Sequence, residues 1–146
     1  MPAWLATGYR TWLAGQAVDL AIDQPCPELD AWLQWQRNVT ACFITACNPG
    51  SQLLSDAENL QRLRLLDAEL FAAGKPALAA SAIPATPDWP PEPARLVAGL
   101  SQFEALSLGR RHGQDAVLWH AREQTTRLII CATVPSHATS HNCTMG

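Results

Sequence analysis

The sequence predicts an α/β (α+β) fold with one mixed β-sheet of about five to six strands and three helices, packed in two or three layers. Short apolar or alternating stretches typical of strands recur along the 146-residue chain. Segments with helical spacing stand between them, and two capping-box motifs mark helix starts. Turn residues separate the segments and give the order strand, helix, strand, helix, strand, strand, helix, strand, strand.

The first third of the chain supplies two of these strands and one helix. Residues 9–22 alternate apolar and polar side chains, which predicts a strand or a hairpin arm. Pro27 suits the first turn of a helix, and apolar residues at helical spacing extend this helix over 27–37. The stretch 41–47 is apolar on both faces, as is typical of an interior strand, and the turn residues 48–51 end it.

The second helix has the clearest start and stop signals in the chain. Ser55 and Glu58 form a capping box, in which each side chain satisfies the backbone amide of the other residue. Gly74 ends the helix and Pro76 prevents its continuation. The leucines predicted to form its buried stripe are Leu60, Leu63, Leu66 and Leu70.

The remaining strands surround a proline-rich segment and a third helix. Four prolines make residues 85–93 an extended surface loop. A second capping box, from Ser101 to Glu104, starts a helix that runs to Gly113. The strands expected in this half, of which the last two form a terminal hairpin, are 77–83, 95–100, 115–120 and 127–134.

Composition bounds the class of protein. We expect residues 9–134 to form one domain and 135–146 to be a flexible tail, because the tail is polar and lacks periodicity. The net charge is −3 and the basic residues are scattered, which disfavours a nucleic-acid partner. The chain has no recognisable signal peptide and no apolar run of about 18 residues, so no membrane association is expected. Five cysteines without framework spacing favour a cytoplasmic location.

Five short motifs occur in the chain in an order and at a spacing that indicate a known family. They are Tyr9-Arg10, Phe43-Ile44-Thr45-Ala46-x-Asn48-Pro49, Ser55-x-x-Glu58-Asn59-x-x-Arg62, Glu92 in the proline-rich segment, and Gly113-Gln114-x-Ala116-Val117-x-Trp119. The chain resembles the bacterial domain-of-unknown-function family 3293 over residues 9 to about 128. This resemblance implies a compact α/β domain and assigns no chemistry. The sequence departs from the family pattern at Cys47 and in its histidine-rich tail.

The turn before the second helix is the first candidate site. Thr45, Asn48, Asn59 and Arg62 are expected to gather there, beside the free amides of the helix start. Arg62 and these amides predict a small anionic ligand. The alternative is that the same residues only cap the helix and form the turn, and Glu58 in the first turn also opposes an anion.

Glu92 and Gln114 form the second candidate. If the proline-rich loop folds over the strand end, Glu92 faces Arg62 as a salt-bridge partner or acts as a general base, and Gln114 contacts a ligand or a loop carbonyl. The alternative, and the interpretation that we prefer for this pair, is a structural clamp that holds the loop. Cys47 is the one plausible nucleophile, although burial is the preferred interpretation of its position.

Three functional hypotheses follow in order of preference: a small-ligand or anion-binding protein, a hydrolase- or transferase-type enzyme using the same pocket, and a protein-interaction module presenting Trp89 and the proline-rich loop. The sequence assigns no catalytic residue, no cofactor and no oligomeric state. His137, His141 and Cys143 supply only part of a zinc ligand set, so no metal site is predicted.

Overall fold

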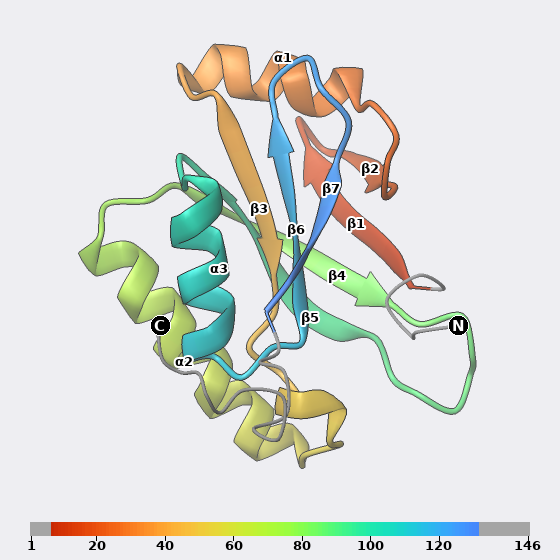
Figure 1. The fold of residues 1–146 in the computed structure, drawn as a ribbon. Coiled ribbons are helices and arrows are strands. Elements are labelled where there is room, and N and C mark those ends of the chain that lie inside the picture. Colours follow the sequence, from red (N-terminus) through yellow and green to blue (C-terminus); the bar gives the residue numbers. More distant parts are fainter. Residues whose placement is uncertain (1–6, 132–146) are drawn as a thin grey trace, which may run out of the picture.

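The computed structural model describes residues 7–131 of the chain. In this range, seven strands form one sheet in the order β2-β1-β4-β5-β3-β6-β7, and every neighbouring pair is antiparallel (Figure 1). The strands are β1 (Gly8–Leu13), β2 (Gln16–Leu20), β3 (Thr40–Ile44), β4 (Ala77–Ile83), β5 (Glu92–Ala98), β6 (Ala116–Ala121) and β7 (Arg127–Ile130). The helices are α1 (Pro27–Gln36), α2 (Asp56–Ala72) and α3 (Gln102–Arg111), with a short 3₁₀ turn at Pro49–Ser51.

The sheet has more strands than the five to six that the sequence predicts. The additional strand comes from residues 9–22, which form the hairpin β1–β2. Its turn is Ala14-Gly15, and both residues have positive φ, as a two-residue hairpin turn requires. Alanine in such a turn lacks the usual Asn-Gly or Asp-Gly signal, so the alternating pattern alone did not reveal the reversal.

The prediction of a mixed sheet is also wrong for the described residues, because all six strand pairings are antiparallel. Helix α2 connects β3 to β4, and helix α3 connects β5 to β6. Such crossovers normally join parallel neighbours. Here β5 lies between β4 and β3, and β3 lies between β5 and β6, so each crossover spans one antiparallel strand.

The sheet is strongly curled. The rings of Tyr9 on β1 and Phe43 on β3 meet edge to face with their centroids 5.3 Å apart, although two strands separate β1 from β3 in the sheet. The concave face therefore encloses a core of its own. Leu29 and Leu33 of α1, both fully buried, join this core. Helix α1 itself lies across one end of the sheet (Figure 1).

Helices α2 and α3 pack on the convex face, which creates a second core (Figure 1). Its helical members include Leu63, Leu66 and Leu70 of α2. Leu60, which the sequence predicts as part of this stripe, is 47% exposed because it lies to one side of the face that the other three leucines share. The helices thus occupy both sides of the sheet, as the three-layer alternative predicts.

The capping motifs and turn residues in the sequence predicted the positions of the helices correctly. Both capping boxes are present, from Ser55 to Glu58 and from Ser101 to Glu104. Strand 77–83 is found as β4, with the proline loop (residues 84–91) between it and β5. No helix in residues 7–131 is long and apolar enough to cross a membrane. The predicted flexible tail, 135–146, and the end of the predicted strand 127–134 lie outside the described residues.

Candidate ligand-binding pocket

A pocket of about 350 Å³ lies at the end of the concave face opposite α1. Three neighbouring strands form one side of it. Tyr9 on β1 is paired with Ala82 on β4, which in turn is paired with Glu92 on β5. Directly paired residues point to the same face of a sheet, so these three side chains stand in a row where the core ends.

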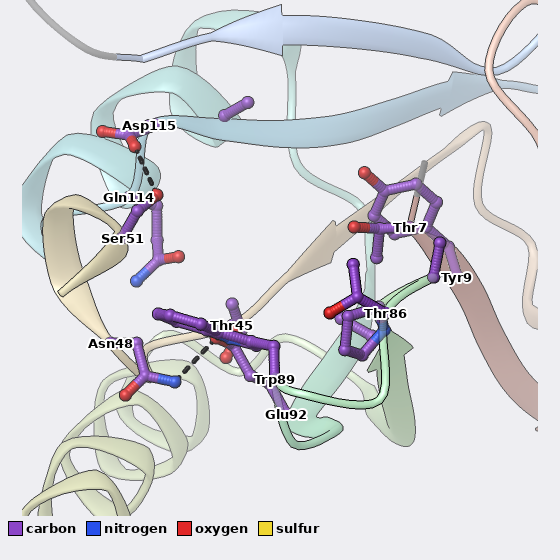
Figure 2. Close-up of a pocket in the computed structure, with 14 residues that line it drawn as sticks. Thr7, Tyr9, Thr45, Asn48, Ser51, Thr86, Trp89, Glu92, Gln114 and Asp115 are labelled. Carbon is purple, nitrogen blue, oxygen red and sulfur yellow. Dashed lines mark hydrogen bonds between the residues drawn. The ribbon is translucent and has the colours of Figure 1, made fainter. Parts of the chain in front are cut away.

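The other walls come from three connections between elements (Figure 2). Thr7 and Tyr9, just before and within β1, lie across the pocket from Gln114 and Asp115 of the α3–β6 connection. The remaining lining residues are Thr7, Thr45, Asn48, Ser51, Pro84, Ala85, Thr86, Trp89, Gln114, Asp115 and Ala116. The volume is within the range of about 300–1,000 Å³ that small-molecule sites occupy.

Asn48 organises the turn after β3. Its backbone is left-handed, with φ 49° and ψ 59°, a conformation that asparagine tolerates better than most residues. Its Oδ1 accepts from the amide of Leu54 and from Nδ2 of Asn59, both at 2.8 Å, while its own amide donates to Oδ1 of Asn59 at 2.9 Å. Its Nδ2 donates to Oε2 of Glu92 at 2.7 Å. The side chain, 4% exposed, is therefore fixed on every side.

Glu92 links this turn to the proline loop. Its Oε2 accepts from Asn48 and also from the indole Nε1 of Trp89 at 3.2 Å. Thr45 ties the end of β3 to the start of β5, because its hydroxyl donates to the carbonyl of Pro93 at 2.8 Å. The loop thus folds over the end of β3, and the clamp that the sequence analysis weighed as an alternative is present in these contacts.

Arg62 does not contact Glu92. Its Nε donates to the carbonyl of Ala46 and its terminal nitrogen to the carbonyl of His112, both at 2.7 Å. The salt bridge with Glu92 that the sequence analysis considered is therefore absent among the described residues. Arg62 is not among the lining residues, and it joins the β3–α2 and α3–β6 connections because one of its two acceptors lies in each.

Gln114 lines the pocket and helps to hold it together. Its Nε2 donates to the carbonyls of Cys47 at 3.1 Å and His112 at 3.2 Å. Of the six side chains predicted as ligand-binding, four line the pocket, namely Thr45, Asn48, Glu92 and Gln114. The other two, Asn59 and Arg62, support it from behind.

The start of α2 does not open into the pocket. Ser55 accepts the amide of Glu58 and Glu58 accepts the amide of Ser55, so the cap is closed by its own side chains. The amide of Ser55, and after it the Ser55 hydroxyl, donate to Oε1 of Glu58 and lower the pKa of this exposed carboxyl. The free amides on which the predicted anion site depended are thus partly occupied, with a carboxylate beside them.

The pocket carries acidic groups and no arginine, lysine or histidine among its described lining residues. Asp115 accepts the hydroxyl of Ser51 on Oδ2 at 2.8 Å. Tyr9 is buried, and burial raises the pKa of its phenol to about 12. At neutral pH the lining therefore holds two carboxyl groups, a neutral phenol and the indole of Trp89.

Cys47 is buried, with 1% of its surface exposed, and burial raises the pKa of its thiol. A reactive cysteine needs the opposite change, so the structural interpretation of Cys47 is the better one. Within residues 7–131, no three histidine, cysteine, aspartate or glutamate side chains gather as metal ligands. His137, His141 and Cys143 lie outside the described residues.

Sequence reasoning missed several lining residues. Tyr9 belongs to the first motif of the family resemblance, so a signal for it existed. Asp115 occupies the variable position between Gln114 and Ala116 of the last motif, which gave no signal. Ser51 and Ala82 carried none, because a serine in a turn and an alanine in a strand are common.

Comparison with known proteins gives a family and no further relative. The family model described as a protein of unknown function (DUF3293) matches residues 44–117, just over half of the chain. The match begins at the end of β3 and ends in β6, so it contains most of the pocket lining. No curated protein and no solved structure matches the chain.

Proposed function

The chain belongs to the DUF3293 family of proteins of unknown function, and we propose that it binds a small organic molecule in the pocket between the proline loop and the end of β3. One observation carries the proposal. A pocket of about 350 Å³ with an aromatic wall is bounded by polar side chains that hydrogen bonds already hold in place. Binding to such a site costs little ordering entropy, because Glu92 and Trp89 are fixed before a ligand arrives.

The position of Trp89 supports binding over the interaction-module hypothesis. That hypothesis requires the proline loop to present the indole to a partner. Instead the side chain is half-buried, lines the pocket and donates to Glu92. The enzyme hypothesis uses Glu92 as a general base, and two hydrogen bonds, from Asn48 and Trp89, already occupy one oxygen of that carboxyl group. Cys47 supplies no nucleophile beside it, because burial raises the pKa of its thiol, so binding is the function that we propose.

A fragment screen with a pocket-filling variant tests the proposal. Ala82 points into the pocket from β4, so Ala82→Phe places a ring in the space that a ligand needs. Ala79 is exposed on the opposite face of the same strand, and Ala79→Phe is the matched control. Ligand-observed NMR with a library of neutral, cationic and anionic fragments measures binding to the three proteins.

We expect a subset of fragments to bind the wild type and Ala79→Phe equally and to lose binding to Ala82→Phe. Circular dichroism and urea denaturation check that both variants fold. No binding fragments at all, or fragments that bind all three folded proteins alike, would contradict the proposal.

A further inference from the structure

Resting on the proposed function, we propose that the ligand carries a positively charged nitrogen, an ammonium or amidinium group, which Glu92 and Asp115 recognise. The sequence analysis predicts an anion instead. The lining residues and their hydrogen bonds indicate whether the ligand is a cation or an anion, because only polar atoms without a partner in the protein can bind a ligand.

Glu92 and Asp115 each keep one oxygen open. Both hydrogen bonds to the Glu92 carboxylate end on Oε2, and the bond from Ser51 to Asp115 ends on Oδ2. Within residues 7–131, Oε1 of Glu92 and Oδ1 of Asp115 have no side-chain or backbone donor. No buried polar side-chain atom in this range lacks a partner, so neither of these two oxygens is buried. A carboxylate oxygen accepts hydrogen bonds and offers none, so it selects donors.

The nearby cations are engaged elsewhere. Arg62 donates to two backbone carbonyls, and Arg95 on β5 forms a two-pronged ion pair with Asp67 of α2, at 2.8 and 3.1 Å. Neither lines the pocket. An anion entering it would therefore meet two carboxylates without a compensating positive charge, and the repulsion would be strong in a partly desolvated site.

Trp89 adds a face that suits a cation. Its indole nitrogen donates to Oε2 of Glu92, which fixes the ring as a wall of the pocket. Ring faces attract ammonium and guanidinium groups, and tryptophan does so most strongly. A cation with an apolar body fits this combination, since alanine and proline side chains make up much of the remaining lining.

Fragments matched in shape and different in charge test the inference. Benzylamine, benzyl alcohol and benzoate share a ring, and isothermal titration at low salt compares their affinities for the wild type. Glu92→Gln keeps an acceptor for Asn48 and Trp89, and Asp115→Asn keeps one for Ser51, so both variants should fold. Glu123→Gln removes an equal charge from an exposed turn and serves as the control, since Glu123 makes no side-chain hydrogen bond to any residue of 7–131.

We expect benzylamine to bind at least about 10-fold more tightly than benzyl alcohol, and benzoate more weakly than both. Glu92→Gln and Asp115→Asn should each weaken amine binding about 5- to 10-fold, while Glu123→Gln should change it less than about 2-fold. One contrary result is that the fragments that lose binding to Ala82→Phe are neutral or anionic, and another is that Glu92→Gln and Asp115→Asn leave amine binding unchanged. Either result would show that the inferred positive charge of the ligand is wrong, while the proposed binding function would stand. If no fragment depends on the pocket, the proposed function itself fails.

Discussion

At the scale of single residues, the pocket depends on two kinds of side chain. The first kind uses its polar atoms in hydrogen bonds within the protein, and the second kind leaves one polar atom without such a bond. Asn48 belongs to the first kind, since its side chain and its amide are used within the fold. Glu92 belongs to both kinds, with one oxygen paired and the other open. A site built in this way is rigid before binding and still offers charge to a ligand.

For Arg62, the role seen in the structure differs most from the role that the sequence predicts. Because Arg62 donates to the carbonyls of Ala46 and His112, Arg62→Ala leaves two carbonyls of buried residues without a charged donor. We expect a loss of about 2–3 kcal/mol in the free energy of unfolding. Arg64 is exposed on the same helix and makes no side-chain hydrogen bond within the described part of the chain, so Arg64→Ala should change the free energy of unfolding by less than about 0.5 kcal/mol. Urea denaturation of both variants checks this, and equal losses would show that Arg62 does not join the two connections.

Tyr9 gives the molecule a defined response to alkaline pH. Burial raises the pKa of its phenol from 10.0 to about 12, so between these values the unfolded chain loses a proton that the folded protein retains. The contribution of Tyr9 to stability is therefore complete below about pH 10 and is lost as the pH rises toward 12, by about 3 kcal/mol in total. Tyr9→Phe should lack this part of the decline, while the buried thiols contribute equally to both proteins.

The chain has one tyrosine, so ultraviolet absorbance follows this titration directly. Urea denaturation of the wild type and Tyr9→Phe from about pH 9 to about pH 12 measures the difference. A phenol that titrates near its ordinary pKa would contradict the burial on which this prediction depends.

At the scale of elements, the connections decide the shape of the pocket. The β3–α2 connection and the α3–β6 connection cross closely, and the amide of Gly50 donates to the carbonyl of Gly113 at 2.8 Å. A Cβ at Gly113 would stand 2.7 Å from Cβ of Pro49, which is held in a ring and cannot swing away. Glycine is needed here for its φ of +69° and for its lack of a side chain.

Gly74, which follows α2, separates these two requirements. Its φ is +68°, but a Cβ there would meet nothing within 4 Å. We expect Gly74→Ala to cost about 1–2 kcal/mol of unfolding free energy from backbone strain alone. Gly113→Ala should cost about 1–3 kcal/mol more because of the contact with Pro49. Thermal and urea denaturation compare the two, and equal costs would mean that the connections do not touch as described.

Elements with local signals were predictable from the sequence. The capping boxes at Ser55 and Ser101 depend on residues three positions apart, so the chain itself displays them. The Ala14-Gly15 turn carried no such signal, and two strands were therefore taken as one. Strand order depends on which distant segments meet, which explains why a mixed sheet was expected where the pairings are antiparallel.

At the scale of the whole molecule, curling of the sheet creates the pocket. Helix α1 covers one end of the concave face, and at the opposite end the connections leave about 350 Å³ between them. The lining residues are spread from Thr7 to Ala116. Four lining residues were identifiable from the sequence as polar residues in or beside connections, namely Thr45, Asn48, Glu92 and Gln114. The sequence did not show that Arg62 would donate to backbone carbonyls outside the pocket. For that reason the sign of the charge in the pocket was not predictable.

The most direct test of a preformed binding pocket is amide and indole NMR of the labelled protein during a titration with benzylamine. The account predicts shifts confined to the pocket, with the Trp89 indole N–H among the largest, and no such shifts in Ala82→Phe. Shifts that are spread over the surface, or centred between α2 and α3 with the Trp89 indole unmoved, would contradict it.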